Sequence, residues 1–301
     1  MSKFGYHIIR GAMRCLGALP LGFHHACGNA LGAFAGSVLR YRRDVVTINL
    51  SRSFPDLKYK EIRKIRRRFY RHLGRLAAEA VWFGACTNPK RLERARLVRL
   101  RNPEIINDLY QKSGSVMLLA THCGNWELLG GFNSYSPGTP LVFPERDVHV
   151  VYKKLSSDSW DRVMIRNRIA PISDPEYDGI VETAAVMRHV LKHRHEKKIY
   201  TFITDQHPYK GSAELEIGEF MHQRTTTMDG AAKLANKFGM AVCFLTFRPT
   251  EKGGWEMGFE PICDDASGMS PEDIMKKYYE LLQKELEATP WNYLWSHKRW
   301  K

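Results

Sequence analysis

The segment Thr121-His122-Cys123-Gly124-Asn125-Trp126-Glu127 places a candidate base and a candidate acid directly after the apolar run 116–120. Functional side chains of α/β folds gather where buried strands end, and histidine is the side chain best suited to proton transfer near neutral pH. Gly124-Asn125 predicts a turn into a helix. Such a junction would let Glu127 hold one ring nitrogen of His122 while the other nitrogen accepts a proton. The segment therefore predicts a base and its orienting acid.

No enzyme nucleophile accompanies this pair. Cys123 adjoins His122, but its side chain is expected to point the opposite way, and no nucleophile-elbow pattern surrounds it. The nucleophile would then be a hydroxyl of the substrate, and transfer would be direct. An alternative interpretation is that His122 is a core histidine bonded to a backbone carbonyl.

The cysteine and histidine spacings do not indicate a metal site. The six cysteines contain no CxxC pair, and HExxH is absent. These spacings also give no disulfide framework, so a reducing compartment is expected. No metal and no cofactor are predicted.

Strands alternate with helices after residue 101. Strands are predicted near 116–120, 141–143, 199–204, 241–247 and 255–259, and helices near 180–193, 229–238 and 271–288. This alternation predicts an α/β fold with a mainly parallel or mixed sheet covered by helices on both faces. The site would lie at the carboxyl ends of the strands, where His122 falls.

The positive charge is confined to the first third of the chain. Residues 1–101 hold 22 Lys and Arg against five Asp and Glu, or +17, whereas the rest holds 24 against 27, or −3. Nine of the cations lie between Lys58 and Arg75, with Glu61 as the single acid. Their helix should bury the face formed by Ile62, Ile65, Phe69, Leu73, Leu76 and Ala80. Because acids are too few for pairing, an external anionic partner is expected: lipid phosphate headgroups, an acidic carrier protein, or both.

Residues 15–39 contain no charged side chain and approach the length of a membrane span. Pro20, two histidines, an asparagine and five glycines dilute their apolarity. Helices that lie in the membrane interface and break near Pro20 are the prediction, with a single span or a buried helical hairpin as alternatives.

Taken together, these motifs resemble the late acyltransferases of lipid A biosynthesis, within the lysophospholipid acyltransferase superfamily and its glycerolipid-acyltransferase-like fold. HxxNWE is similar to the histidine–acid motif of that branch. The resemblance extends over nearly the whole chain through four further elements: Tyr41-Arg42-Arg43 with Asn49-Leu50 and Ser53-Phe54-Pro55, then Arg166-Asn167-Arg168, then Asp205-Gln206, then the ending 291–301. One departure is Glu219-Phe220-Met221-His222, where the family commonly has Phe-Phe-Gly, so acceptor and chain-length preference do not carry over.

The resemblance implies transfer of a fatty acyl chain from a thioester to a hydroxyl of a lipid A precursor. The donor would be acyl carrier protein, or else coenzyme A, and neither metal nor nucleotide is needed. His122 would be the general base and Glu127 its orienting acid. The implied substrate-binding residues are Asn125, Arg166, Arg168, Asp205 and Gln206. A register shift would give the arginine role to Arg162 or Arg168.

The expected organisation is a basic, helical, membrane-associating region at 1–100 and an α/β acyltransferase domain at 101–301. Expected partners are an acidic acyl carrier protein, anionic membrane lipids and the lipid acceptor, at the cytoplasmic face of a bacterial inner membrane. The nearest alternative keeps the chemistry and changes the acceptor to a lyso-aminolipid or lysoglycerolipid. A non-catalytic anionic-lipid-binding protein is a second. Nucleic acid is not an expected partner, because no known nucleic-acid module is present.

Overall fold

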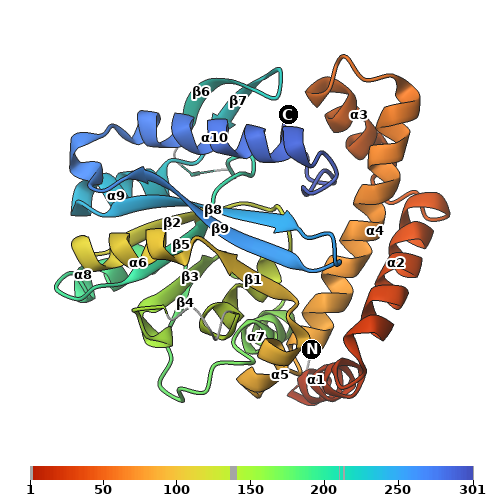
Figure 1. Ribbon diagram of the computed structural model, residues 1–301, viewed down its shortest axis with the longest axis horizontal. Coiled ribbons are helices and arrows are strands. Elements are labelled where there is room, and N and C mark those ends of the chain that lie inside the picture. The colour runs from red at the N-terminus through yellow and green to blue at the C-terminus, as the bar shows by residue number, and fades with distance from the viewer. Residues whose placement is uncertain (1–2, 136–140, 210, 213, 301) are drawn as a thin grey trace.

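The strands form one seven-stranded sheet in the order β1-β9-β8-β2-β5-β3-β4. The computed structural model describes residues 3–135, 141–209, 211, 212 and 214–300 (Figure 1). The strands are β1 (Val98–Arg101), β2 (Val116–Ala120), β3 (Val148–Tyr152), β4 (Ile180–Glu182), β5 (Ile199–Ile203), β8 (Ala241–Pro249) and β9 (Trp255–Cys263). All neighbouring strands pair in parallel except β8 and β9, which are antiparallel. The predicted mixed, mostly parallel sheet is confirmed.

Both faces of the sheet are buried. Every residue of β2 is buried, and alternate residues enter two different apolar cores. Met117 and Leu119 pack with helices α9 (Gly230–Phe238) and α10 (Pro271–Ala288), and Leu118 packs with α6 (Pro103–Lys112) on the other face. This two-sided burial explains why β2 is a continuous apolar run instead of an alternating one.

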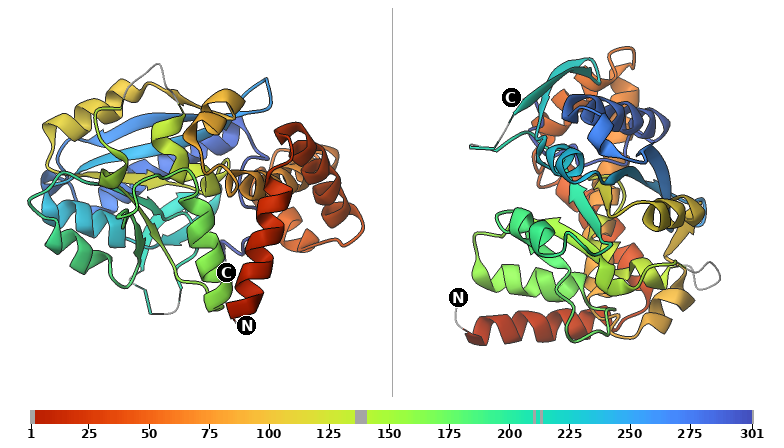
Figure 2. Two further views of the ribbon diagram at one scale, coloured as in Figure 1. Left: turned by 90° about the horizontal axis from the view of Figure 1, so that it is seen from below. Right: turned by 90° about the vertical axis from the view of Figure 1, so that its left-hand side faces the viewer.

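The chain outside the sheet is mainly helical. The remaining α-helices are α1 (Lys3–Gly17), α2 (Leu21–Ser37), α3 (Arg43–Ser53), α4 (Tyr59–Phe83), α5 (Pro89–Ala95), α7 (Asp158–Arg168) and α8 (Val186–Lys192). Short 3₁₀ helices are η1 (Trp126–Ser134), η2 (Glu145–Asp147) and η3 (Ala266–Gly268), and β6 (Leu215–Phe220) pairs with β7 (Gln223–Thr227) in a separate hairpin. Helix α4 runs along one side of the sheet, and α1 lies beside α7 (Figures 1 and 2).

Two of the predicted elements were wrong. Residues 141–143 form bends, and the strand in this region is β3, which begins at Val148. The predicted helix 180–193 is a strand, β4, followed by the shorter helix α8. Ile180-Val181 pairs beside β3, so the tertiary position overrides the helical period of the sequence. The helix 271–288 is confirmed, with the Ser270 side chain accepting from the Asp273 N–H at 3.1 Å.

The glycines of residues 15–39 have a packing function. Helix α1 ends and α2 begins on the two sides of Pro20, as predicted, and α2 then packs on α4. A Cβ at Gly32 would lie 2.0 Å from the carbonyl oxygen of Tyr70, and one at Gly28 would lie 2.8 Å from that of Gly74. The two backbones therefore approach too closely for any other residue. None of the described helices is both long and apolar enough to cross a bilayer.

Candidate active site

Strand register brings His122 and Asp205 together. Ala120 of β2 pairs with Ile203 of β5, and a single residue separates the end of each strand from its site residue. Because the strands are parallel and adjacent, His122 and Asp205 emerge at the same edge and at the same level. The sequence placed each of them after a strand but could not show that those strands are neighbours.

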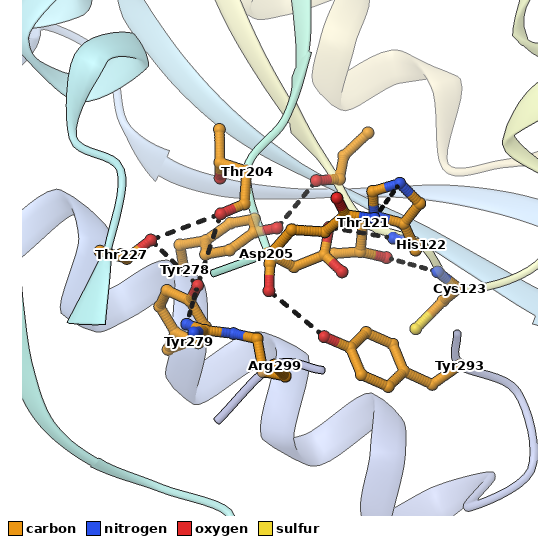
Figure 3. Close-up of polar contacts among 12 residues, drawn as sticks. Thr121, His122, Cys123, Thr204, Asp205, Thr227, Tyr278, Tyr279, Tyr293 and Arg299 are labelled. Carbon is orange, nitrogen blue, oxygen red and sulfur yellow. Dashed lines mark hydrogen bonds and ion pairs between the residues drawn. The ribbon is translucent and has the colours of Figure 1, made fainter. Parts of the chain in front are cut away.

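Asp205 fixes the orientation of the His122 ring. Asp205 Oδ1 lies 2.8 Å from His122 Nδ1 and also accepts from the backbone N–H of His122 at 3.1 Å (Figure 3). With Nδ1–H donating to this carboxylate, Nε2 carries the lone pair. The Gln206 amide nitrogen lies 3.1 Å from Nε2 and donates to it. The ring of Trp126 contacts the imidazole edge-on, with ring centroids 4.7 Å apart.

The carboxylate of Asp205 is buried and ionised. Burial opposes ionisation, but the electrostatic interaction with the His122 imidazole, its hydrogen bond and two backbone N–H groups outweigh it and hold the pKa of Asp205 below the ordinary value. Tyr293 donates to the backbone carbonyl of Asp205 at 3.3 Å, and Tyr278 donates to that of Ala120 at 2.8 Å (Figure 3). These phenols fasten both strand ends to the C-terminal part of the chain.

The turn after His122 requires glycine. Gly124 has φ +65°, and a Cβ there would lie 1.5 Å from Cδ1 of Phe247. Its N–H donates to Asn292 Oδ1 at 2.9 Å, which ties the turn to the terminal motif of the sequence. Asn125 is fully buried, donates to Glu79 Oε2 at 3.0 Å and accepts from the Glu127 N–H at 3.3 Å. Asn125 thus joins the turn to α4, and it is not among the residues that line the cavity.

The expectation that Glu127 holds His122 was wrong in its geometry. Both carboxylate oxygens of Glu127 accept from Arg168, each at 2.8 Å, and Asp205 takes the place expected for Glu127. Trp126 and Glu127 open the 3₁₀ helix η1, which directs Glu127 toward the end of α7. Burial lowers the pKa of Arg168, but the pairing with Glu127 more than compensates and raises it, so the guanidinium is permanently charged.

The three residues of Arg166-Asn167-Arg168 lie in different surroundings. Arg168 lies in the wall of the cavity beside His122, whereas Arg166 is on the exposed face of α7. The pKa of Arg10 in α1 is lowered, mainly by burial and in smaller part by the charge of the nearby Arg166. Asn167 is buried and donates to the carbonyl of Ala80 at 2.9 Å. Arg162 is also exposed. The cavity arginine is therefore Arg168.

A cavity of about 560 Å³ adjoins His122. Its size is typical of small-molecule sites. Its wall combines apolar side chains with a smaller polar set. The apolar members include Leu129, Val150, Val151, Ile180, Phe202, Ile203 and Met228; the polar members include His122, Lys153, Arg168, Gln206, His207 and His297. The arrangement suits a ligand with a long apolar part and a polar reacting end.

Sequence reasoning missed Glu79. This α4 carboxylate is fully buried and accepts from Arg75 at 2.9 Å, Asn125 at 3.0 Å and the indole N–H of Trp255 at 2.7 Å. Burial opposes its ionisation, but His25 and these donors lower its pKa. The available signal was an isolated acid within the apolar segment 76–83 of an otherwise basic helix.

The N-terminal and C-terminal motifs of the sequence meet beside the site. The Asn49 side chain donates to the carbonyls of Trp295 and His297, both at 2.9 Å, and Arg42 donates to that of Ser296 at 3.0 Å. Arg299 is buried and donates to Tyr279 at 2.8 Å. Lys301, the last residue of the terminal motif, lies outside the described residues.

Comparison with known proteins agrees with this geometry. The family model described as bacterial lipid A biosynthesis acyltransferase matches residues 1–301. This chain belongs to that family. It is therefore an acyltransferase of lipid A biosynthesis, and the resemblance read from the sequence is confirmed. A search of curated proteins gave no match.

Proposed function

We propose that this acyltransferase moves a fatty acyl chain from acyl carrier protein to a hydroxyl of a lipid A precursor, with His122 as the general base. The observation that carries the proposal is the pairing of His122 with the buried Asp205 carboxylate in the wall of a mostly apolar cavity. A histidine held through Nδ1 by a carboxylate has its Nε2 lone pair available, as in catalytic triads.

The proposed reaction is a direct displacement. The acceptor hydroxyl replaces the Gln206 amide at His122 Nε2 and gives its proton to that nitrogen as its oxygen attacks the thioester carbonyl carbon. The tetrahedral intermediate collapses, the carbon–sulfur bond breaks, and the thiol sulfur takes the proton back from the imidazolium. Asp205 stabilises the imidazolium and does not itself accept the proton. A thioester is already activated, so this sequence calls for no covalent enzyme intermediate.

Arg168 is proposed as the cation of the substrate site, and Glu127 as the residue that positions it. The bidentate pair, with both distances at 2.8 Å, fixes the guanidinium in the wall of the cavity that His122 also lines. Glu127 uses two acceptor sites on Arg168, which leaves further N–H groups for a headgroup phosphate or a developing oxyanion. Gln206 occupies His122 Nε2 until the acceptor hydroxyl replaces it, and Asn125 positions His122 indirectly by fixing the turn that follows it.

A cationic groove supports an acidic carrier protein as the donor. Arg43, Arg63, Arg66, Arg67 and Arg71 line a hollow of about 300 Å³ between α2, α3 and α4. No Asp or Glu is among the described residues that line it. Such a surface attracts an acidic protein and speeds its encounter.

Exposed apolar side chains on α1 and α2 support attachment to the cytoplasmic face of the inner membrane. Phe23, Leu31 and Phe34 are exposed on the face of α2 opposite the glycines that contact α4, and Val38, directly after the helix, is also exposed. A helix of this kind inserts its apolar face into the interface, where neighbouring cations bind anionic lipid. We therefore propose residues 1–100 as the membrane-associating region and 101–301 as the catalytic domain.

Mass spectrometry of a lipid A precursor, incubated with acyl carrier protein thioesters, tests the proposal. Wild-type protein should add the mass of one acyl group, and His122→Ala should add none. A total lipid extract incubated in parallel distinguishes acceptors, because acylation of lysolipids alone would assign the chemistry to a different lipid. No mass gain on either substrate, with folded and membrane-bound wild-type protein, would contradict the proposed reaction.

A further inference from the structure

A second histidine cluster lies away from the cavity edge that holds His122. It brings together His149 of β3, Asp178 of the loop before β4, and His189 of α8. One side-chain ligand atom from each of these residues lies within 4.8 Å of the other two. His149 pairs in register with Tyr200, which pairs with Met117, five residues before His122. At about 3.3 Å per strand residue, the cluster is remote from the catalytic histidine.

The environment of His149 is unusual for a structural histidine. Its side chain is fully buried, and neither ring nitrogen has a hydrogen-bond partner among the described residues. Buried polar groups are nearly always hydrogen-bonded, so a buried imidazole with both nitrogens unpaired is destabilising unless it binds a ligand. The His149 ring therefore offers a nitrogen to a ligand at this place in the fold.

His189 of α8 and His193, which directly follows that helix, each have a partner at the Nδ1 atom. His189 Nδ1 lies 3.3 Å from the Tyr200 hydroxyl, and His193 Nδ1 lies 2.9 Å from Glu196 Oε1. The Nε2 atoms of both are buried and lack a hydrogen bond in the part of the chain that the structure describes. Metal-binding histidines commonly show this arrangement, in which an outer partner fixes one nitrogen and the other faces the ion. His189 lies in the last turn of α8 and His193 directly follows that helix, and their ring centroids are 4.5 Å apart.

We propose that His149, Asp178 and His189 bind a divalent transition-metal ion, with Zn²⁺ as the best fit. Two imidazoles and one carboxylate match the ligands of Zn²⁺ and its first-row neighbours, whereas Mg²⁺ and Ca²⁺ prefer oxygen alone. Ligand atoms around tetrahedral Zn²⁺ at about 2.0–2.1 Å lie roughly 3.3 Å apart, so the site must contract. Asp178 can supply this movement, because it lies in a loop with its side chain 57% exposed and 3.7 Å from His189.

The ion would fasten helix α8 to two segments of the chain that continue into one wall of the catalytic cavity. Val150 and Val151, which follow His149 on β3, line that cavity, as does Ile180, which follows Asp178 by two residues. The metal would join β3, the loop before β4 and helix α8 without reaching His122. Its role is thus structural, and its binding is separable from acyl transfer.

The test uses untagged full-length protein, stripped with a chelator and titrated with Co²⁺ and then Zn²⁺. We expect one Co²⁺ per chain with the visible absorption of a four-coordinate nitrogen–oxygen site, displacement by Zn²⁺, and a higher melting temperature with Zn²⁺. Asp178→Asn and His189→Gln should each weaken Zn²⁺ binding at least tenfold and abolish the melting shift. His195→Gln removes a nearby exposed histidine outside the cluster and should change neither.

Two results would overturn the metal site: no stoichiometric Co²⁺ or Zn²⁺ on the wild-type protein, or an equal loss of binding in His195→Gln, which would indicate adventitious surface binding. Asp178→Asn alters an exposed loop side chain, so it reports on the ligand set even where loss of His189 impairs folding. Melting in chelator alone checks that each variant is folded.

Discussion

The N-terminal helices and the strand ends around His122 differ in how their polar groups are satisfied. Along α4 and the groove beside it, arginines outnumber acids and most of them face solvent, and α2 exposes apolar side chains. Around His122, the carboxylates of Asp205, Glu79 and Glu127 are buried, and each accepts hydrogen bonds from named donors. The first region has the properties of a surface for external partners. The second has those of a site that holds atoms in fixed positions.

The two regions are nevertheless joined by buried contacts. Val46, Leu50 and Ile62 of the N-terminal helices pack in the same apolar core as Met117 and Leu119 of β2. Glu79 of α4 binds Asn125 in the turn after His122. The N-terminal helices thus help to position the base as well as offering a surface, and variants can separate these two contributions.

The largest effect on catalysis without an effect on membrane binding is expected from His122→Ala. Loss of a positioned general base should lower the acyl-transfer rate constant by roughly 1,000-fold, within the usual 100- to 10,000-fold range. Vesicle binding and melting temperature should stay close to wild type, because the ring is at the cavity wall. The measurement is single-turnover transfer with vesicle co-sedimentation, and His195→Ala is the control. A rate within tenfold of wild type would contradict the assignment of the base.

Changes on the apolar face of α2 should have the opposite result, weaker membrane binding without an effect on catalysis. Changing Phe23, Leu31 and Phe34 together to Gln should weaken binding to anionic vesicles about 100-fold, because about half of each side chain is exposed and its insertion contributes roughly 1 kcal/mol. Transfer to a detergent-dispersed acceptor should be unchanged. The matched control replaces Val142, Met187 and Leu191, which are exposed elsewhere. Equal vesicle binding by the two triple variants would show that α2 is not the membrane face.

A smaller effect is expected in the cationic groove. Arg63→Glu with Arg67→Glu should raise KM for acyl carrier protein about tenfold at low salt and leave kcat unaltered, since exposed charges steer encounter. The difference in KM between this variant and wild type should disappear near 0.5 M salt, because salt at that concentration screens the attraction between exposed charges. Lys192→Glu with Lys277→Glu gives the same net charge on other surfaces. If that control raises KM equally, the groove has no special role.

An effect on stability alone is expected at His72, where α4 meets the rings of Trp255 and Trp291. Burial lowers its pKa to about 4 from 6.5. The unfolded chain therefore binds this proton first as pH falls, so the stabilising contribution is complete above pH 6.5 and is lost between 6.5 and 4. At pH 5 the loss is on the order of 2 kcal/mol relative to pH 7.5.

Urea unfolding at several pH values measures this loss. His72→Gln should reduce the dependence of unfolding free energy on pH between 7.5 and 5, while the remaining slope reports the other buried histidines, including His149. An unchanged slope in His72→Gln would mean that His72 is not held neutral in the folded chain.

The part of the fold set by local pattern could be predicted from sequence. Strand β2, helix α10 with its Ser270 cap, and the break at Pro20 all follow from short-range rules. The strand at residues 180–182 could not be predicted, because only its pairing with β3 makes this segment a strand. The glycines of α2 gave an ambiguous signal: they dilute apolarity in the sequence, and only the partner helix reveals their packing role.

The site shows the same limit more sharply. His122 could be selected by type and position, and Asp205, Gln206 and Arg168 by the family resemblance, but their pairing depends on strand order. An expected strand–turn–helix junction placed Glu127 against His122; the parallel register of β2 and β5 instead brings Asp205, which is 83 residues away. Glu79 and His149 were missed because the groups that they contact come from other helices, strands and loops, which the sequence does not reveal.

The division of roles between Asp205 and Glu127 is most directly tested by comparing single-turnover acyl transfer in Asp205→Asn and Glu127→Gln at saturating substrate. If Asp205 fixes the base, Asp205→Asn should slow the chemical step roughly 100-fold or more, because the ring loses its tautomer and its counter-charge. Glu127→Gln should slow that step at least ten times less and mainly raise KM for the acceptor through Arg168. A loss of rate in Glu127→Gln that equals or exceeds the loss in Asp205→Asn would contradict this account.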